Sequence, residues 1–332
     1  MTTTAKVAIC IPTYNQAPYL ERAVRSAVAQ MYPCEVWVSD DASTDETPEI
    51  MARLVREYPR IRHIRHQENM GIQGNPRWTL QQPSTEYIVR LDSDDELHPG
   101  YVEKLRNNLA AHPLAGYAHA AVQEIDSDGQ KQRLRLLARG AGFQSGKDSL
   151  RASVTGYRVA ANILLFRRSA LEEVDNYRPG LSFAEDWDLA VRLADAGWGN
   201  IYVNEVLANY RVWETAGQLR SRRKLSEIEG CRRVFDDSLT PAFSRRNWSL
   251  ATISVARRRM AARHAVCLRS NLFNDAERRN LKTALCELGD SLALRWKFCW
   301  IDTPLAPLFQ LPANVIVGAK AAAKTMLFNR HN

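Results

Sequence analysis

Three carboxylates stand within four positions directly after a short apolar run, and this spacing constrains the chain more than any other feature. The run is Tyr87–Arg90, and Asp92, Asp94 and Asp95 follow it. A strand that ends in clustered acids places them at the carboxyl edge of a sheet, where open α/β folds bind ligands. Such close carboxylates repel one another unless a cation lies between them, and oxygen ligands favour Mg²⁺ or Mn²⁺. The alternative is an acidic turn that caps a helix starting near Pro99.

A second acidic cluster follows another predicted strand. Residues 35–39 have the pattern of a buried strand and lead into Asp40, Asp41 and then Asp45, after which helical spacing begins. Two strands therefore deliver carboxylates to one edge of what we predict to be a single sheet. Helix capping is an alternative explanation for Ser43 and Asp45, but it leaves Asp40 without a role.

The N-terminal segment has the pattern of the first unit of a nucleotide-binding α/β fold. An apolar run at residues 7–11 breaks at residues 12–15, Pro-Thr-Tyr-Asn, and an amphipathic helix is predicted next. The apolar face of that helix comprises Leu20, Val24, Ala27, Val28 and Met31. Neither GxGxxG nor GxxxxGK[ST] occurs, which argues against a dinucleotide dehydrogenase or a P-loop NTPase.

Five short motifs, taken together, resemble those of the family 2 glycosyltransferases. In chain order they are Pro12-Thr13-Tyr14-Asn15, Asp40-Asp41-Ala42-Ser43-Thr44-Asp45, Asn69-Met70-Gly71, Leu91-Asp92-Ser93-Asp94-Asp95 and Glu185-Asp186-Trp187-Asp188. The resemblance covers roughly residues 6–214. It implies a GT-A fold, in which helices flank a mixed central sheet, and an inverting transfer of a sugar from a nucleotide-diphosphate donor.

The resemblance also implies a role for each matching residue. The residues expected to bind the donor nucleotide are Pro12, Thr13, Tyr14, Asn15, Asp40, Gly71, Arg77, Asp92, Ser93 and Arg211. Among them, Tyr14 would offer its ring to the base and Asp40 would accept a hydrogen bond from a base N–H. Asp94, together with Asp95, would ligate Mn²⁺ or Mg²⁺ bridging the diphosphate of the donor, which is most simply a UDP-sugar.

The reaction itself requires groups of this kind. Glycosyl transfer passes through an oxocarbenium-like state, so the departing diphosphate must be stabilised and the acceptor hydroxyl activated. Asp186 is expected to be the general base, with Glu185 and Trp187 supporting the acceptor side; the alternative for Asp186 is a helix-start acid. One base without a second nucleophilic carboxylate implies inversion at the anomeric carbon.

One segment departs from the family pattern. Family members often end the catalytic domain with Tyr-Arg-x-His, whereas this chain has Tyr210-Arg211-Val212-Trp213. Trp213 cannot ligate a metal, so we expect either that Arg211 neutralises the diphosphate or that water fills the vacant coordination position. A core position at the domain boundary is the favoured interpretation of Trp213.

Charge divides the chain near residue 214. Residues 1–214 hold 24 Lys and Arg against 28 Asp and Glu, whereas residues 215–332 hold 21 against 9, a net charge of +12. We therefore predict a catalytic domain at 1–214 and a basic helical region at 215–332. Asn274 and Glu277 are spaced like a capping box, and leucines follow at helical intervals: Leu281, Leu285, Leu288 and Leu292.

Two interpretations of the basic region stay open: adsorption to an anionic membrane surface, or a solvated helical subdomain. Aromatic and apolar residues lie within it, namely Trp296, Phe298, Trp300, Leu308 and Phe309. Nucleic acid is not an expected partner, because no recognised binding motif occurs. Gly-rich residues 126–151 are predicted to form a mobile loop beside the site.

Location is predicted from cysteines and from hydropathy. The six cysteines show no CxxC spacing, which is typical of reduced thiols that are mostly buried. No signal-peptide pattern and no run of eighteen apolar residues occurs. We expect a cytoplasmic protein, with peripheral binding at the inner face of the membrane as the finer alternative.

The function predicted is transfer of a sugar to a hydroxyl of a glycan or lipid-linked glycan in cell-surface polysaccharide synthesis. Two alternatives remain at this stage. A nucleotidyltransferase of similar fold would use the same acids to hold a nucleoside triphosphate, and a non-catalytic module would only bind a sugar nucleotide or glycan.

Overall fold

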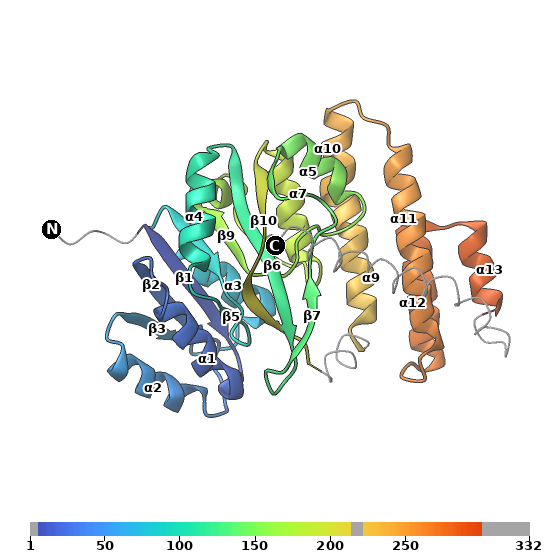
Figure 1. Cartoon of the computed structure of the whole chain (residues 1–332). Coiled ribbons are helices and arrows are strands. Elements are labelled where there is room, and N and C mark those ends of the chain that lie inside the picture. Colours follow the sequence, from blue (N-terminus) through green and yellow to red (C-terminus); the bar gives the residue numbers. More distant parts are fainter. Residues whose placement is uncertain (1–5, 214–221, 301–332) are drawn as a thin grey trace. The chain divides into compact units, whose positions relative to one another are not determined.

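The computed structural model describes residues 6–213 and 222–300, and these form two compact units (Figure 1). The first, the sheet unit, comprises Met1–Arg151, Tyr157–Pro179 and Arg192–Val212. The second, the helical unit, comprises Ala152–Gly156, Gly180–Val191 and Trp213–Asn332. The main boundary therefore falls close to residue 214, but two short earlier segments also belong to the helical unit. Whether 1–214 folds as an independent domain stays a prediction.

A single mixed sheet organises the sheet unit. Its strands are β1 (Val7–Thr13), β2 (Cys34–Asp40), β3 (Ile61–Arg65), β4 (Tyr87–Arg90), β5 (Glu96–Leu97), β6 (Ala115–Ile125), β7 (Lys131–Arg135), β8 (Gly142–Gln144), β9 (Leu164–Arg167) and β10 (Gly199–Arg211). The order is β3-β2-β1-β4-β9-β6-β10-β5, with β7 paired to β6 and β8 to β10. Strands β3, β2, β1 and β4 run parallel, and β9 runs antiparallel between β4 and β6. The predicted mixed α/β architecture is confirmed.

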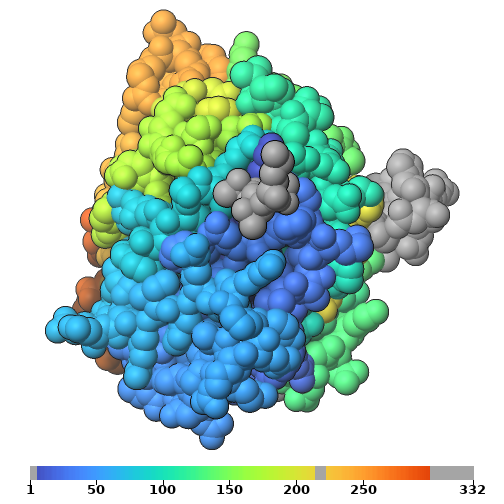
Figure 2. Space-filling model, turned by 90° about the vertical axis from the view of Figure 1, so that its left-hand side faces the viewer, coloured from blue at the N-terminus to red at the C-terminus, as the bar shows by residue number. Residues whose placement is uncertain are grey.

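Helices follow most strands of the sheet unit, parallel and antiparallel alike. They are α1 (Ala17–Val28), α2 (Thr47–Glu57), α3 (Gly71–Gln81), α4 (Tyr101–Ala111), α5 (Gly146–Ser153) and α6 (Arg168–Glu173). Helix α1 buries Leu20, Val24 and Ala27 as predicted, because their spacing puts them on one face. Met31 is 69 % exposed, since α1 ends at Val28 and position 31 no longer follows the helical face. Figure 2 shows a face built largely from these N-terminal elements, in blue.

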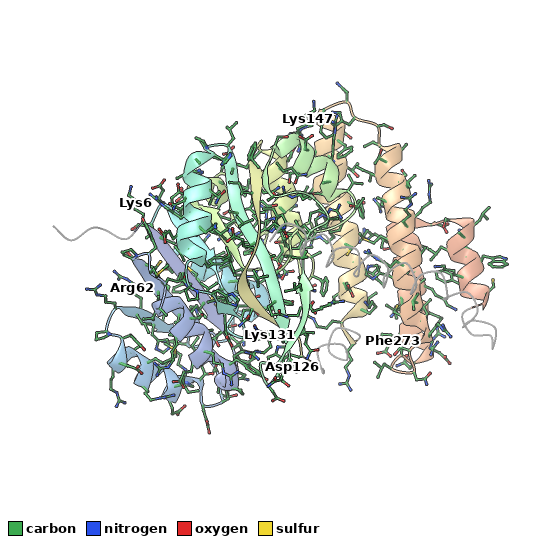
Figure 3. All side chains as sticks on the ribbon, viewed as in Figure 1. Lys6, Arg62, Asp126, Lys131, Lys147 and Phe273 are labelled. Carbon is green, nitrogen blue, oxygen red and sulfur yellow. The ribbon has the colours of Figure 1, made fainter. Side chains whose placement is uncertain are left out.

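The segment 126–151 holds two strands and the start of α5, so the prediction of a mobile loop over its whole length is wrong. Strand β7 pairs antiparallel with β6 across a tight turn, and β8 pairs antiparallel with β10. In that turn the N–H of Gly129 donates to the carbonyl of Asp126 at 3.1 Å. Figure 3 labels Asp126 and Lys131 at this β6–β7 hairpin. Because β7 is exposed and rich in basic residues, its sequence lacks the apolar alternation that signals a strand.

The helical unit is all-helical beyond residue 222 in its described part. Its elements are α9 (Lys224–Arg233), a π-helical segment (Val234–Leu239), α10 (Thr240–Arg245), α11 (Ala251–His264), a 3₁₀ turn (Ala265–Arg269), α12 (Asp275–Gly289) and α13 (Leu292–Trp300). The predicted capping box is confirmed, since Asn274 and Glu277 each bond the other's backbone N–H. Leu292 is 87 % exposed, because α12 ends at Gly289 and Leu292 begins a new helix.

Helices α11 and α12 pack with their backbones in close approach. A Cβ on Gly289 would lie 2.5–2.6 Å from backbone atoms of Arg257 and Arg258. The guanidinium of Arg257 also donates to the carbonyls of Leu288 at 2.7 Å and Glu287 at 2.9 Å. Arg257 thus satisfies the last carbonyls of α12, which have no partner inside that helix.

Two predictions about the thiols and about membrane spans can be compared with this structure. None of the six cysteines forms a disulfide; Cys10 and Cys231 are buried, Cys299 is exposed, and Cys34, Cys267 and Cys286 are intermediate. The prediction that the thiols are mostly buried is therefore wrong for Cys34, Cys267, Cys286 and Cys299. Within residues 6–213 and 222–300, no helix is both long and apolar enough to cross a membrane.

Candidate active site

Three strand ends meet at one edge of the sheet, as the acidic motifs predict. Thr13 at the end of β1 lies in register with Asp40 at the end of β2, and Cys10 lies in register with Arg90 at the end of β4. Because the three strands are parallel, the residues that follow them share this edge. Ligands of open α/β sheets bind at this kind of edge.

The loop after β1 is held against the loop after β2. The N–H of Asn15 donates to the hydroxyl of Ser43 at 2.9 Å, and the Asn15 side-chain oxygen accepts the N–H of Thr44 at 2.8 Å. Asn15 has φ +51°, a left-handed conformation that asparagine tolerates better than most residues. Between these contacts Tyr14 is 47 % exposed, so its ring is available to a planar ligand.

The capping interpretation of the second motif holds for Asp45 but not for Ser43, whose hydroxyl accepts the N–H of Asn15 instead. Asp45 accepts the N–H of Ala17 at 3.0 Å in the first turn of α1, and that of Thr47 at 3.0 Å. Partial burial opposes ionisation, but these hydrogen bonds lower the pKa of Asp45. Asp45 therefore fastens α1 to the β2 loop.

The two aspartates at the end of β2 face different partners. Asp40 is fully buried: Oδ1 accepts the N–H of Ser43 at 3.0 Å, and Oδ2 lies 3.4 Å from Nε of Arg65 with no hydrogen-bond donor in the described residues. Asp41 accepts the N–H groups of Met70 at 2.7 Å and Gly71 at 3.0 Å. A carboxylate at these N–H groups stabilises the start of α3. The role of Asp41 was missed, because sequence does not reveal which helix start lies beside it.

The guanidinium of Arg77, which was expected to bind the donor, is bonded to other groups of the protein. Its Nη2 pairs with the carboxylate of Asp175 at 2.7 Å, and its Nη1 donates to the carbonyls of Asp175 and Tyr177. These bonds tie α3 to the turn at residues 175–177. A direct contact of Arg77 with the donor stays a prediction and would require some of these bonds to open.

The segment 91–96, the acidic loop, follows β4 and carries the remaining carboxylates. Asp92 is partly exposed and pairs with Nε of Arg90 at 3.0 Å. Asp95 is buried, and its Oδ1 accepts the backbone N–H of Arg211 at 2.8 Å. Burial, then the charges of Asp94 and Asp92, raise the pKa of Asp95 well above its usual range. Asp94 is partly exposed, so the loop presents Asp92 and Asp94 outward and keeps Asp95 inside.

Arg211, the last residue of β10, has its side chain buried against this loop and not on the surface. Its side chain is 0 % exposed, and Nη2 donates to the carboxylate of Glu96 at 2.9 Å. Direct neutralisation of a diphosphate, the role expected from sequence, finds no support in this arrangement, because the guanidinium already serves protein acceptors. Trp213, two residues further on, is partly buried, and its place in a core at the domain boundary stays a prediction.

The acidic loop suits a divalent cation in its donor chemistry. The buried Oδ2 of Asp95 has no hydrogen-bond partner among the described residues, and carboxylate oxygens are preferred ligands of Mg²⁺ and Mn²⁺. No three or more His, Cys, Asp or Glu side chains in residues 6–213 and 222–300 are grouped to hold a metal ion. The protein would thus contribute one or two carboxylates, with the donor's phosphates and water completing the shell.

The fifth motif begins α7 (Glu185–Asp195), where Glu185 and Asp186 are partly exposed. The two residues that follow them are buried. Trp187 donates from Nε1 to the carbonyl of Ser153 at 2.9 Å and packs edge-on against Phe235, and Asp188 accepts the hydroxyl of Ser238. These contacts, all inside the helical unit, fix the first turn of α7. Trp187 therefore supports Asp186 structurally.

Comparison with known proteins identifies the family. A model of glycosyl transferase family 2 matches residues 8–175, about half of the chain. The chain belongs to this family. Family membership favours glycosyl transfer over the nucleotidyltransferase alternative.

The family 2 relatives include much longer proteins. The chain is 29 % identical over 192 residues to a chondroitin synthase of Pasteurella multocida, a match that covers 58 % of this chain and 19 % of that protein. It is 34 % identical over 116 residues to the GalNAc(5)-diNAcBac-PP-undecaprenol beta-1,3-glucosyltransferase of Campylobacter jejuni, covering 34 % of this chain and 36 % of the relative. The chain thus spans about a fifth of the length of the Pasteurella synthases.

Solved structures share the fold. S. aureus TarS 1–349 in complex with UDP-GlcNAc superposes with a TM-score of 0.66 at 18 % identity, covering 85 % of this chain and 80 % of TarS 1–349. The mannosyltransferase PcManGT of Pyrobaculum calidifontis, in complex with GDP-Man and Mn²⁺, superposes with a TM-score of 0.53 at 21 % identity, covering 91 % and 89 %. The predicted GT-A fold is confirmed.

Proposed function

We propose that this chain is an inverting glycosyltransferase that moves a sugar from a nucleotide-diphosphate donor to a hydroxyl of a glycan or lipid-linked glycan. The observation that carries the proposal is the meeting of Tyr14, the β2 loop and the acidic loop at one sheet edge. A UDP-sugar is the proposed donor, supported by the UDP-GlcNAc complex of TarS. Polysaccharide or lipid-linked glycan synthesis is supported by the names of the chondroitin synthase and undecaprenol-linked relatives.

On the donor side, the exposed ring of Tyr14 would stack on the base and Asp92 would contact the ribose. Asp94, backed by Asp95, would ligate the cation. Mn²⁺ or Mg²⁺ at that position would supply Lewis-acid stabilisation of the departing diphosphate. Asp40 is buried and accepts the N–H of Ser43, so we assign it to holding the loop after β2 in place while no nucleobase is bound.

On the acceptor side, Asp186 would take the proton of the attacking hydroxyl. A positioned carboxylate base contributes typically about 10²–10⁴-fold to such a reaction. The buried neighbours Trp187 and Asp188 keep the first turn of α7 in place, which a base needs for alignment. A single base gives one displacement and an inverted anomeric centre.

A donor panel tests this function. The full chain would be incubated with UDP-, GDP-, dTDP- and CMP-linked sugars, Mn²⁺ and a mixed glycan acceptor, and free nucleotide would be measured. We expect release with one or more UDP-sugars and an inverted linkage in the NMR spectrum of the product. Retained configuration would refute the single displacement, and binding of every donor without turnover would favour a binding module.

We further propose that the chain works peripherally at an anionic membrane surface, through α11. The exposed residues of this helix include Arg258, Arg259, Arg263 and Val255, which is 37 % exposed, and Val266 in the 3₁₀ turn that follows is 45 % exposed. None of the three arginines pairs with a carboxylate of the described residues, and α11 has no acidic residue. Arginines beside exposed aliphatic side chains suit anionic lipid headgroups. Leu308 and Phe309, which the sequence also places in the basic region, lie outside the described residues.

A further inference from the structure

Arg211 joins four parts of the sheet unit at the acidic loop. Its Nε donates to the carbonyl of Asp94 at 2.9 Å, and its Nη2 to the carboxylate of Glu96 at 2.9 Å. Its Nη1 donates to the carbonyls of Asp126 at 2.7 Å and Ser127 at 3.2 Å, in the β6–β7 turn. Four of the five N–H groups of a guanidinium are thus used, and the group lies 4.5 Å from the ring centroid of Tyr19 in α1.

The backbone of Arg211 adds a further link. Its N–H donates to Oδ1 of Asp95 at 2.8 Å, so one residue contacts Asp94, Asp95 and Glu96. A buried guanidinium with this many acceptors has one favourable position, because each lost bond leaves a buried polar group unsatisfied. The course of the loop backbone at Asp94 therefore depends on β10.

Arg90 holds the other end of the same loop. Its side chain is 8 % exposed, its Nε bonds Asp92 at 3.0 Å, and its Nη1 bonds the hydroxyl of Tyr177 at 2.6 Å. Two arginine charges thus lie among four carboxylates, at Asp92, Asp94, Asp95 and Glu96. They reduce the repulsion that clustered acids would otherwise suffer.

We propose that Arg211, assisted by Arg90, is a positioning residue that holds the acidic loop in its ligand-ready conformation before a cation or nucleotide binds. The guanidinium groups of Arg211 and Arg90 position the loop, so a bound metal ion is not needed for that and interacts with the ligand. The inference deepens the proposed function and rests on it only for the identity of the ligand; loop order in the free protein is independent of that identity.

The direct test is hydrogen exchange of the ligand-free full chain. In Arg211→Met, amides of residues 92–96 should exchange at least tenfold faster than in the native chain, because their local opening no longer breaks the guanidinium bonds. The matched control is Arg167→Met. Arg167 also donates to carbonyls, of Ala115 at 3.1 Å and Leu109 at 2.7 Å, and lies near the ring of Tyr87, at the start of β4. Its loss should leave exchange at residues 92–96 unchanged.

Binding provides the second readout. Mn²⁺ binding measured by electron paramagnetic resonance, and UDP binding measured by calorimetry with Mn²⁺, should each weaken at least tenfold in Arg211→Met and less than twofold in Arg167→Met. Arg211→Lys keeps the positive charge but loses the planar guanidinium with its several donors. Its affinities for Mn²⁺ and UDP should therefore lie between those of the native chain and of Arg211→Met. Failure of the native chain to bind UDP would overturn the proposed donor, while the exchange result would still decide the role of Arg211.

Two results would overturn the inference. One is unchanged exchange at 92–96 in a folded Arg211→Met. The other is an equal effect of both methionine variants, which would reduce Arg211 to general stability. If Arg211→Met does not fold, Tyr19→Leu removes the ring beside the guanidinium and leaves Arg211 in place, and unchanged exchange and Mn²⁺ binding in that variant and in Arg211→Lys would equally refute the proposal.

Discussion

Two sets of arginines, one in each unit, are used in opposite ways. In the sheet unit, Arg90 and Arg211 are buried and bonded to carboxylates, carbonyls and a tyrosine, so their guanidinium groups interact with the protein itself and fix the acidic loop. On α11 of the helical unit, Arg258, Arg259 and Arg263 are exposed and have no carboxylate partner in the described chain. Buried arginine specifies a local geometry, whereas exposed unpaired arginine leaves charge for an external partner.

The largest effect should come from the loop that the buried arginines hold. Asp94→Ala should lower transfer by about 10³-fold or more, because a carboxylate-bound ion supplies several kcal/mol of charge stabilisation. EDTA should do the same to the native chain, and Mn²⁺ should restore it. Nucleotide release assays measure both. Asp128→Ala is the control, since Asp128 is exposed in the β6–β7 turn. Full activity of the native chain in EDTA would contradict the metal assignment.

The next effect separates chemistry from binding. Asp186→Asn should lower kcat by roughly two or more orders of magnitude, while UDP affinity stays near native, because the base acts only on the acceptor. Steady-state kinetics and calorimetry give the two numbers. Asp195→Asn, at the other end of α7, should change neither. A large loss of UDP affinity in Asp186→Asn would make Asp186 a donor-site or structural residue instead.

The edge of the sheet was predictable because its signals are local. An apolar run followed by acids marks the end of a strand, so residues 40–45 and 91–95 could be placed at one edge from sequence. The cap formed by Asn274 and the bond from the N–H of Thr47 to Asp45 are equally local, whereas the bond from Ala17 to Asp45 spans 28 positions.

The contacts that hold the site were not predictable, because their partners are distant in sequence. The carbonyl of Asp126 lies 85 positions from Arg211, and Asp41 reaches α3 from 29 positions away. Exposed strands such as β7 carry no apolar alternation, so residues 126–151 resembled a loop. An arginine in a motif suggests phosphate binding, but only the fold reveals whether protein acceptors already use it.

The exposed arginines of α11 should act at a surface and not in folding. Replacing Arg258, Arg259 and Arg263 together by glutamine should weaken binding to phosphatidylglycerol-containing liposomes by up to about 3 kcal/mol, since each basic residue near such a surface contributes about 1 kcal/mol. Cosedimentation at low and high salt measures this, because exposed charges are screened. The melting temperature and turnover on a soluble acceptor should stay native.

Salt-insensitive binding, or equal binding of native and triple-glutamine chains, would contradict this role for α11. Binding to neutral liposomes would point instead to apolar side chains such as those of Leu292 and Trp296, which are 87 % and 56 % exposed. A native chain that stays in the supernatant with anionic liposomes at low salt would leave α11 as a solvated face and make a soluble acceptor the better proposal.

The smallest effect concerns acid stability, and it should fall on the sheet unit. His119 in β6 is fully buried beside the rings of Tyr117 and Tyr202, and burial, together with the charge of Arg139, lowers its pKa to about 3. An unfolded histidine has a pKa of about 6.5, so below that value the unfolded chain binds the extra proton and the folded chain does not. The stability present above pH 6.5 is therefore lost progressively as the pH falls towards 3, by about 2 kcal/mol between pH 7.5 and pH 5.

Urea unfolding at several pH values, comparing the native chain with His119→Phe, isolates this contribution. The phenylalanine ring keeps an aromatic side chain between the two tyrosines but cannot titrate. As the pH falls, the unfolding free energy of the native chain should therefore decrease relative to that of His119→Phe. Exchange measurements at pH 5 should show the loss in the strands around β6 before it reaches α11 and α12, where no buried histidine is described. Parallel pH profiles for both chains would contradict this prediction, because they would mean that protonation of His119 does not contribute to the acid sensitivity of the chain.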